Sequence, residues 1–198
     1  LARGIHYSQI LRNQGNMNRE SFDNHFDKIH ELSGERCLVV GFGDVGNRLA
    51  KVCKALEMSV SAVGRSIDEH DSLDNIFTLE QLSEAVSDAD YVVNLLPLNA
   101  ETEKVFTKQV FNRMKSSAFF INIGRGETVD EESLILALKS KKIAGAGLDV
   151  FAQEPLTKDS PLWNMESVIL SPHVAGLSKG YWDRQADLFM QNLKHYLE

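Results

Sequence analysis

Residues 36–56 read RCLVVGFGDVGNRLAKVCKAL and decide the fold of this chain. A short apolar run, residues 37–40, leads into three glycines, and an amphipathic helical pattern follows them. Gly41 permits a tight turn, Gly43 lets the backbone approach a pyrophosphate, and Gly46 lets the helix pack on its strand. The stretch therefore predicts the strand, turn and helix of a dinucleotide site, with a plain glycine turn in an α/β sheet as the alternative.

Strand and helix patterns then alternate along the chain. Apolar runs predict further strands at residues 58–63, 91–96, 118–123, 143–150 and 168–170. Helices are expected at residues 78–87, 107–114 and 134–139, and a long amphipathic helix carries Tyr181 to Tyr196. This alternation indicates an α/β fold of the Rossmann type, a doubly wound parallel sheet with flanking helices.

The composition narrows the classes of partner. The chain has 198 residues, 43% of them hydrophobic, so we expect one dinucleotide-binding core. Its net charge of −7 gives no basic surface, so we expect no affinity for nucleic acid or anionic lipid. Cys37 and Cys53 show no metal-ligand spacing, so we expect reduced packing residues, no metal and a cytoplasmic location. No apolar run is long enough for a membrane span.

The end of the second predicted strand bears on the choice of coenzyme. An NAD site normally places Asp or Glu there to accept hydrogen bonds from the ribose hydroxyl, but this chain has Gly64, Arg65 and Ser66. Arg65 and Ser66 offer donors suited to a 2′-phosphate. NADP is therefore favoured over NAD, and the alternative is that Arg65 stacks on the adenine or lies in solvent.

Reactive side chains follow several predicted strands. Arg125 follows one strand, Asp149 and Glu154 follow the next, and His173 follows the last. Taken singly, each has an ordinary explanation: Arg125 as a surface cation, Asp149 as a helix or loop cap, Glu154 as a solvated carboxylate and His173 as a turn residue. Ligands of open α/β sheets gather at the carboxyl ends of the strands, so these four side chains are expected to converge there.

Six blocks of the sequence carry a family resemblance. They are GFGDVG at 41–46, NLLPLNAET at 94–102, INIGRGETVDEESL at 121–134, GLDVFAQEPL at 147–156, SPLW at 160–163 and SPHVAG at 171–176. In this order and spacing, the chain resembles the cofactor domain of the D-isomer-specific 2-hydroxyacid dehydrogenases. Its pattern is most similar to that of the glyoxylate and hydroxypyruvate reductases.

The resemblance implies a reaction and a set of site residues. The reaction is hydride transfer between NADP(H) or NAD(H) and a small 2-keto or D-2-hydroxy acid, with Arg125, Glu154 and His173 as the catalytic set. The implied cofactor-binding residues are Gly41, Gly43, Asp44, Val45, Gly46, Arg65, Ser66, Leu96, Pro97, Thr102, Ile123, Gly124, Arg125, Asp149, His173, Ala175 and Gly176.

Each catalytic role also has a physical reason. A planar guanidinium such as Arg125 can hold an α-keto carboxylate and polarise the carbonyl. His173 can give or take one proton, since imidazole titrates near neutral pH, and Glu154 would hold its ring. Formate dehydrogenases of the family carry Gln where this chain has Glu154, so formate is an unexpected substrate.

The resemblance also divides the chain. Residues 1–35 match a helix and arm that lead into the cofactor domain and are expected to contribute to a homodimer, and residues 36–198 match that domain. The family's substrate domain has no counterpart in these 198 residues. Two non-enzymatic alternatives stay open, a dinucleotide-sensing protein similar to corepressors and a dimerising scaffold domain.

Overall fold

A computed structural model describes residues 1–26, 29–65, 67–68 and 70–197. Within these residues, seven strands form one parallel sheet in the order β3-β2-β1-β4-β5-β6-β7. The strands are β1 (Arg36–Val40), β2 (Ser59–Val63), β3 (Asn75–Phe77), β4 (Tyr91–Asn94), β5 (Phe119–Asn122), β6 (Gly145–Leu148) and β7 (Val168–Leu170). The predicted doubly wound fold is confirmed, because the order reverses beside β1.

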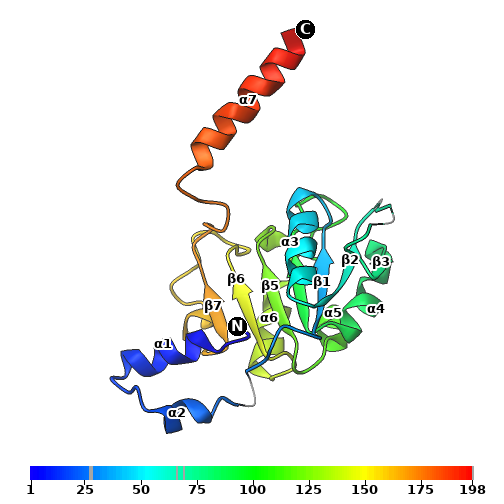
Figure 1. The fold of residues 1–198 in the computed structure, drawn as a ribbon. Helices are drawn as coiled ribbons and strands as arrows, with labels where there is room; N and C mark the ends of the chain where they lie inside the picture. Colours follow the sequence, from blue (N-terminus) through cyan, green and yellow to red (C-terminus); the bar gives the residue numbers. More distant parts are fainter. Residues whose placement is uncertain (27–28, 66, 69, 198) are drawn as a thin grey trace.

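Helices cover both faces of the sheet (Figure 1). They are α1 (Ile5–Asn13), α2 (Arg19–Asp23), α3 (Asp44–Ala55), α4 (Leu82–Ala85), α5 (Lys108–Arg113), α6 (Glu131–Lys139) and α7 (Tyr181–Leu197). Short 3-10 turns are η2 (Leu79–Gln81), η3 (Val86–Asp88), η4 (Gly126–Thr128) and η5 (Pro161–Asn164). The helix α3 lies on one face, and α4, α5 and α6 lie on the other.

The alternation of side chains along β1 builds two cores. Leu38 and Val40 pack toward α4, α5 and α6, whereas Cys37 and Val39 pack toward α3. All four side chains are buried, as expected for a central parallel strand whose sequence is a continuous apolar run.

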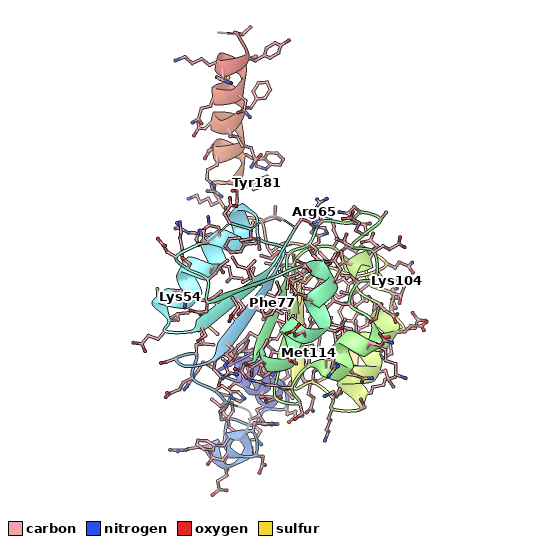
Figure 2. All side chains as sticks on the ribbon, turned by 90° about the vertical axis from the view of Figure 1, so that its right-hand side faces the viewer. Lys54, Arg65, Phe77, Lys104, Met114 and Tyr181 are labelled. Atoms are coloured by element: carbon pink, nitrogen blue, oxygen red, sulfur yellow. The ribbon has the colours of Figure 1, made fainter. Side chains whose placement is uncertain are left out.

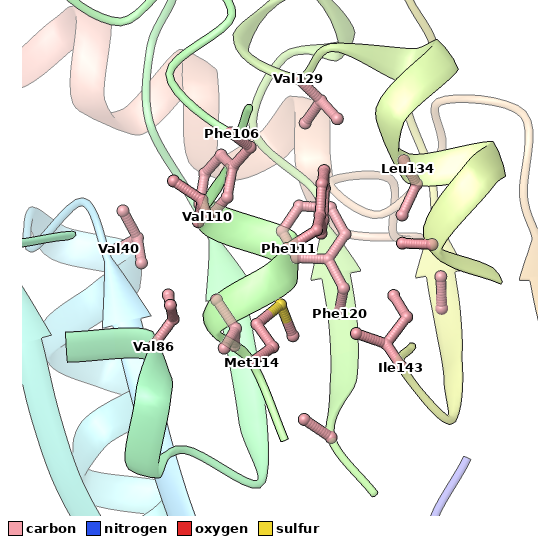
Figure 3. Packing of buried hydrophobic residues seen from close by; sticks show 14 of the residues in the cluster. Val40, Val86, Phe106, Val110, Phe111, Met114, Phe120, Val129, Leu134 and Ile143 are labelled. Carbon is pink, nitrogen blue, oxygen red and sulfur yellow. The ribbon is translucent and has the colours of Figure 1, made fainter. Parts of the chain in front are cut away.

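Aromatic side chains fill the larger core (Figure 3). Phe106, Phe111 and Phe120 contact one another with ring centroids 4.9 to 6.4 Å apart, and Met114 lies beside them. Each buried ring contributes about 1.5 to 3 kcal/mol relative to an exposed one. This core packs α5 and α6 against one face of the sheet.

Apart from shifts of one to three residues at the ends of elements, the structure differs from the sequence prediction in two places. The edge strand β3 was not predicted, because its three residues are exposed or half-buried and lack an apolar run. The predicted helix at residues 78–87 is instead a succession of η2, α4 and η3. Its capping box is confirmed, since the Thr78 amide donates to Gln81 Oε1 at 3.0 Å and both reciprocal bonds are present.

The last helix stands clear of the sheet (Figure 1). Within residues 181–197, no side chain is buried, although the helix has the expected amphipathic pattern. None of the helices in the described part of the chain has the length and apolar character needed to cross a bilayer.

Candidate active site

Gly41 and Gly46 behave as their spacing predicts. Gly41 has φ +99°, and a Cβ there would lie 2.9 Å from the main-chain carbon of Leu95. A Cβ on Gly46 would lie 2.7 Å from the Gly41 carbonyl oxygen, so the absence of a side chain lets α3 approach β1. At Gly43 a Cβ would meet no atom within 4 Å, which leaves open space beside the start of α3.

Asp44 and Val45 form the first turn of α3 and are exposed. The first amides of a helix have no partner within it, and they favour an anion at this end. The open space at Gly43 and the helix start at Asp44 therefore fit the phosphates of a dinucleotide.

Arg65 lies at the end of the domain from which α7 extends, as the labels in Figure 2 show. It follows β2, its side chain is 76% exposed, and its Nη1 is 3.7 Å from Glu101 Oε2. Such an exposed pair contributes about 0 to 1 kcal/mol, so Arg65 is available to another anion. Ser66, predicted to bind cofactor with Arg65, lies outside the described residues.

The turn after β4 is held by its own hydrogen bonds. Leu96 is buried, Pro97 is exposed, and the buried Thr102 hydroxyl donates to the Pro97 carbonyl at 2.6 Å. Thr102 Oγ1 also accepts from the Asn99 amide at 2.9 Å. Thr102 thus shapes the loop that the sequence predicts to line the cofactor cleft.

Glu154 and His173 form the closest ionisable pair of the predicted set. His173 Nδ1 lies 2.7 Å from Glu154 Oε2, and Glu154 Oε1 accepts from the Phe151 amide at 3.1 Å. Burial alone would raise the pKa of Glu154, but the bonds from His173 and Phe151 and the charge of Arg125 hold it below its usual range. Glu154 is therefore an anion that orients the imidazole and leaves Nε2 free to face a ligand.

Arg125 follows β5 and is exposed at the same edge. Its Nη1 donates to the Gly124 carbonyl at 2.7 Å, and its charge acts on Glu154. Ile123 is partly exposed beside it, whereas Gly124 is buried and a Cβ there would lie 2.7 Å from the Leu96 carbonyl oxygen. Arg125 thus lies at the same edge as the Glu154–His173 pair, near enough for its charge to act on Glu154.

Asp149 holds the turn that carries His173. Its carboxylate accepts from Ser171 Oγ at 2.6 Å and from the Val174 and Ala175 amides at 2.9 and 2.8 Å. Its main-chain carbonyl accepts from the His173 amide at 2.8 Å. Gly176, also in the predicted set, follows this turn and is exposed, with open space where a Cβ would lie.

Replacing Asp149 by asparagine is expected to lower the free energy of unfolding by about 1 to 3 kcal/mol at pH 7, since an amide cannot accept all three bonds. Burial alone would raise the pKa of Asp149, but these hydrogen bonds lower it overall. Its stabilisation is therefore complete above the ordinary carboxyl pKa of about 4 and is lost as pH falls through the lower, folded-state value.

Urea unfolding at pH 7 and in acid checks this expectation. The difference between Asp149→Asn and the unsubstituted chain should shrink in acid, while the control Asp159→Asn, at an exposed position, should change stability little at either pH. An Asp149→Asn difference that stays constant into acid would contradict the assignment.

The structure adds two features that the motifs did not predict. A cavity of about 590 Å³ borders Glu154 and His173, and apolar residues make up most of its wall, namely Phe151, Pro155, Leu156, Trp163, Leu170 and Pro172. Behind Arg125, three buried polar side chains bond to one another, Asn94, Asn122 and Thr128. The sequence signal for this second feature is a pair of asparagines, Asn94 and Asn122, each at the end of an apolar run that predicts a strand.

In the described ranges, no group of three or more metal-ligating side chains gathers.

These features define a class of protein, a dinucleotide-binding α/β domain with a guanidinium and a carboxylate–imidazole pair at the carboxyl edge of its sheet. Residues 1–175 match the family model described as "D-isomer specific 2-hydroxyacid dehydrogenase, NAD binding domain". The chain belongs to this family.

Two curated relatives and one solved structure illustrate the match. The chain is 41% identical over 147 residues to a probable 2-ketogluconate reductase of Dictyostelium discoideum, covering 73% of this chain and 43% of the relative. It is 43% identical over 138 residues to glyoxylate/hydroxypyruvate reductase B of Salmonella newport (strain SL254), covering 69% and 42% respectively. The chain therefore spans less than half the length of these relatives.

The solved structure is a D-isomer specific 2-hydroxyacid dehydrogenase from Xanthobacter autotrophicus Py2 in complex with NADPH and MES. It superposes with a TM-score of 0.84 at 30% identity, over 98% of this chain and 77% of that one. The likeness extends over nearly the whole described fold.

Proposed function

We propose that this chain is the dinucleotide-binding part of an oxidoreductase that interconverts a small 2-keto acid and a D-2-hydroxy acid. The observation that carries the proposal is the 2.7 Å contact between His173 Nδ1 and Glu154 Oε2, with Arg125 close enough to influence that carboxylate. A proton-transfer group and an anion-binding group at one edge of the sheet are what reduction of a keto acid needs.

The chain's own residues fit a dinucleotide. The amides of Asp44 and Val45 would meet the pyrophosphate in the open space beside Gly43. Leu96, Pro97 and Thr102 would line the cleft beyond β4, and Arg65 would meet the adenosine ribose. The turn after β5, Asp149 and the turn at 173–176 would surround the nicotinamide, which supplies the hydride when bound.

Arg125 would bind the substrate carboxylate and polarise the reacting carbonyl. Its exposed guanidinium presents paired donors that match the two oxygens of a carboxylate. Positive charge beside the carbonyl oxygen also stabilises the negative charge that develops there during reduction.

His173 would move the proton of the reaction. With Nδ1 held by Glu154, Nε2 can protonate the nascent alkoxide during reduction or accept the hydroxyl proton during oxidation. The Glu154 carboxylate holds Nδ1 of the ring in either direction of the reaction. Formate dehydrogenases of the family carry glutamine at this position, so Glu154 argues against formate as the substrate.

Glyoxylate and hydroxypyruvate are the first substrates to test, and 2-ketogluconate is the next, because the two curated relatives are reductases named for these acids. The assay is the oxidation of NADPH or NADH by the full-length protein in the presence of each acid. Turnover supports the enzyme. Tight dinucleotide binding with no turnover on any acid would support the alternative, a dinucleotide-sensing protein.

We also propose NADP(H) as the preferred coenzyme, since the relative from Xanthobacter autotrophicus is complexed with NADPH and Arg65 stands free of a strong partner. Arg65→Ala is then expected to weaken NADPH binding about 10- to 100-fold, because one charge-assisted hydrogen bond to the phosphate is lost. NADH lacks that phosphate, so its binding should be nearly unchanged. Isothermal titration with each coenzyme measures both constants.

The matched control is Arg113→Ala, which removes an exposed arginine at the end of α5. It should alter neither constant. Equal losses of NADPH and NADH affinity in Arg65→Ala would show that Arg65 contacts a part common to both coenzymes and would overturn the 2′-phosphate assignment.

We further propose that the enzyme acts as a homodimer in the cytoplasm. Residues 1–35 are offered as a contributor to the dimer contact, and residues 36–198 as the dinucleotide-binding domain. Sedimentation of the full-length protein with and without residues 1–35 tests whether the protein is a dimer and whether these residues contribute to it.

A further inference from the structure

Three polar side chains lie buried beneath the proposed catalytic edge. Asn94 ends β4, Asn122 ends β5 and Thr128 ends η4, and their exposed fractions are 0%, 2% and 0%. Burying an amide or hydroxyl is costly unless it is hydrogen-bonded. We call these three side chains the polar ring.

The hydrogen bonds of the polar ring form a closed network. Asn94 Nδ2 donates to Asn122 Oδ1 at 2.9 Å and to Thr128 Oγ1 at 2.7 Å. The main-chain oxygen of Arg125 completes the network, because it accepts from Asn122 Nδ2 at 3.3 Å and from Thr128 Oγ1 at 2.6 Å. Both hydrogens of the Asn94 amide and the one hydroxyl hydrogen of Thr128 are thus used.

The polar ring also fixes the two neighbouring turns. Asn94 Oδ1 accepts from the Leu96 amide, and Asn122 Oδ1 accepts from the Gly124 amide, each at 3.1 Å. The turns are in close contact, since a Cβ on Gly124 would lie 2.7 Å from the Leu96 carbonyl oxygen. The polar ring and this close contact therefore hold the two turns against each other.

We propose that the polar ring is a positioning device for Arg125, an inference that rests on the proposed function. Among the described residues, the guanidinium makes one hydrogen bond, to the carbonyl of its own neighbour Gly124. Its place relative to His173 is therefore set by the backbone of residue 125, and the polar ring holds that backbone. The ring side chains are buried behind the turn and act through Arg125 without touching substrate.

The first test is Thr128→Val in the full-length protein, a change of similar shape that removes the hydroxyl. A displaced guanidinium should lower kcat/KM for the 2-keto acid about 10- to 100-fold, since misplacement of about 1 Å has effects of that order. The dissociation constant for the dinucleotide should rise by a smaller factor than kcat/KM falls, because the Leu96 and Gly124 amides keep their own acceptors on Asn94 and Asn122. Thr128→Ser, which keeps the hydroxyl, should restore most of the activity.

Ser133→Ala is the matched control, because it removes a buried hydroxyl on α6 that donates to Asp130, the residue before that helix, and is not bonded to Arg125. Its kcat/KM should stay at the unsubstituted value. An equal loss in Ser133→Ala would show that any buried hydroxyl in this region matters and would overturn the positioning role.

A double-mutant cycle separates positioning from stability. In an Arg125→Ala background, Thr128→Val should cause no further loss of kcat/KM, whereas a merely structural effect would add. Additive losses overturn the inference. If Arg125→Ala itself leaves turnover unchanged, or no 2-keto acid is reduced, the proposed function is wrong instead.

Amide hydrogen exchange tests the polar ring without turnover. The amides of Leu96 and Gly124 should exchange faster in Thr128→Val than in the unsubstituted protein or in Thr128→Ser, because their acceptors belong to the ring. Unchanged exchange at both amides would overturn the inference whatever the activity.

Discussion

Replacing His173 is expected to lower kcat for the reduction of a 2-keto acid about 100- to 10,000-fold, the contribution of a positioned acid or base. Without the imidazole, water must protonate the alkoxide. The dissociation constant for the dinucleotide should change little, because the loss lies in the proton-transfer step. Steady-state kinetics of His173→Ala with glyoxylate or hydroxypyruvate, together with titration of the coenzyme, measures both quantities.

The backbone of His173 suggests a second variant. Its φ is +56°, a conformation that asparagine adopts more readily than alanine. His173→Asn should therefore preserve the turn better than His173→Ala and yet be equally slow. The control His195→Ala, on the exposed helix α7, should retain full activity. Substantial activity in His173→Asn would show that the turn matters and that the imidazole does not transfer the proton.

Replacing Arg125 by alanine is expected to lower kcat/KM for the 2-keto acid about 30- to 5,000-fold, equivalent to about 2 to 5 kcal/mol for truncating one partner of a hydrogen-bonded charge pair. Arg125→Lys should recover little, since an ammonium cannot bind a carboxylate through two parallel bonds. The loss should appear in both KM and kcat, because the same group binds the carboxylate and polarises the carbonyl.

The measurement that checks this is kinetics with saturating coenzyme over a range of keto-acid concentrations. Coenzyme affinity should be retained, and Arg113→Lys, an exposed arginine on α5, serves as the control. Full recovery in Arg125→Lys would mean that positive charge alone is required. Unchanged kinetics in Arg125→Ala would remove Arg125 from the site.

The sequence predicts most of the sheet because local patterns determine it. The apolar run before Gly41 and the helix pattern after it give β1 and α3, and parallel strands buried on both faces are readable as unbroken apolar runs. The edge strand β3 escapes prediction because its residues have no such run. Tertiary pairing with β2, through Ser61 to Val63, creates that strand.

The proposed catalytic set was also accessible from the sequence, since Arg125, Glu154 and His173 follow strands that end at one edge. What the sequence could not supply was the support around them. The Asp149 carboxylate holds the His173 turn through three bonds, and the polar ring holds the Arg125 backbone. The Asp149 bonds join residues 22 to 26 positions apart, and the Asn94 amide bonds to residues 28 and 34 positions away, so no local spacing predicts these contacts. The two bonds to the Arg125 carbonyl oxygen span three residues each, and Asn94 joins their donors.

The most direct test of the account is a crystal structure of the full-length protein with NADPH and oxalate, a stable mimic of a 2-keto acid. The account predicts one oxalate in contact with both the Arg125 guanidinium and His173 Nε2, at about 2.7 to 3.2 Å, with the bond between His173 and Glu154 intact. Oxalate bound away from Arg125, or an imidazole separated from Glu154 in that complex, would contradict it.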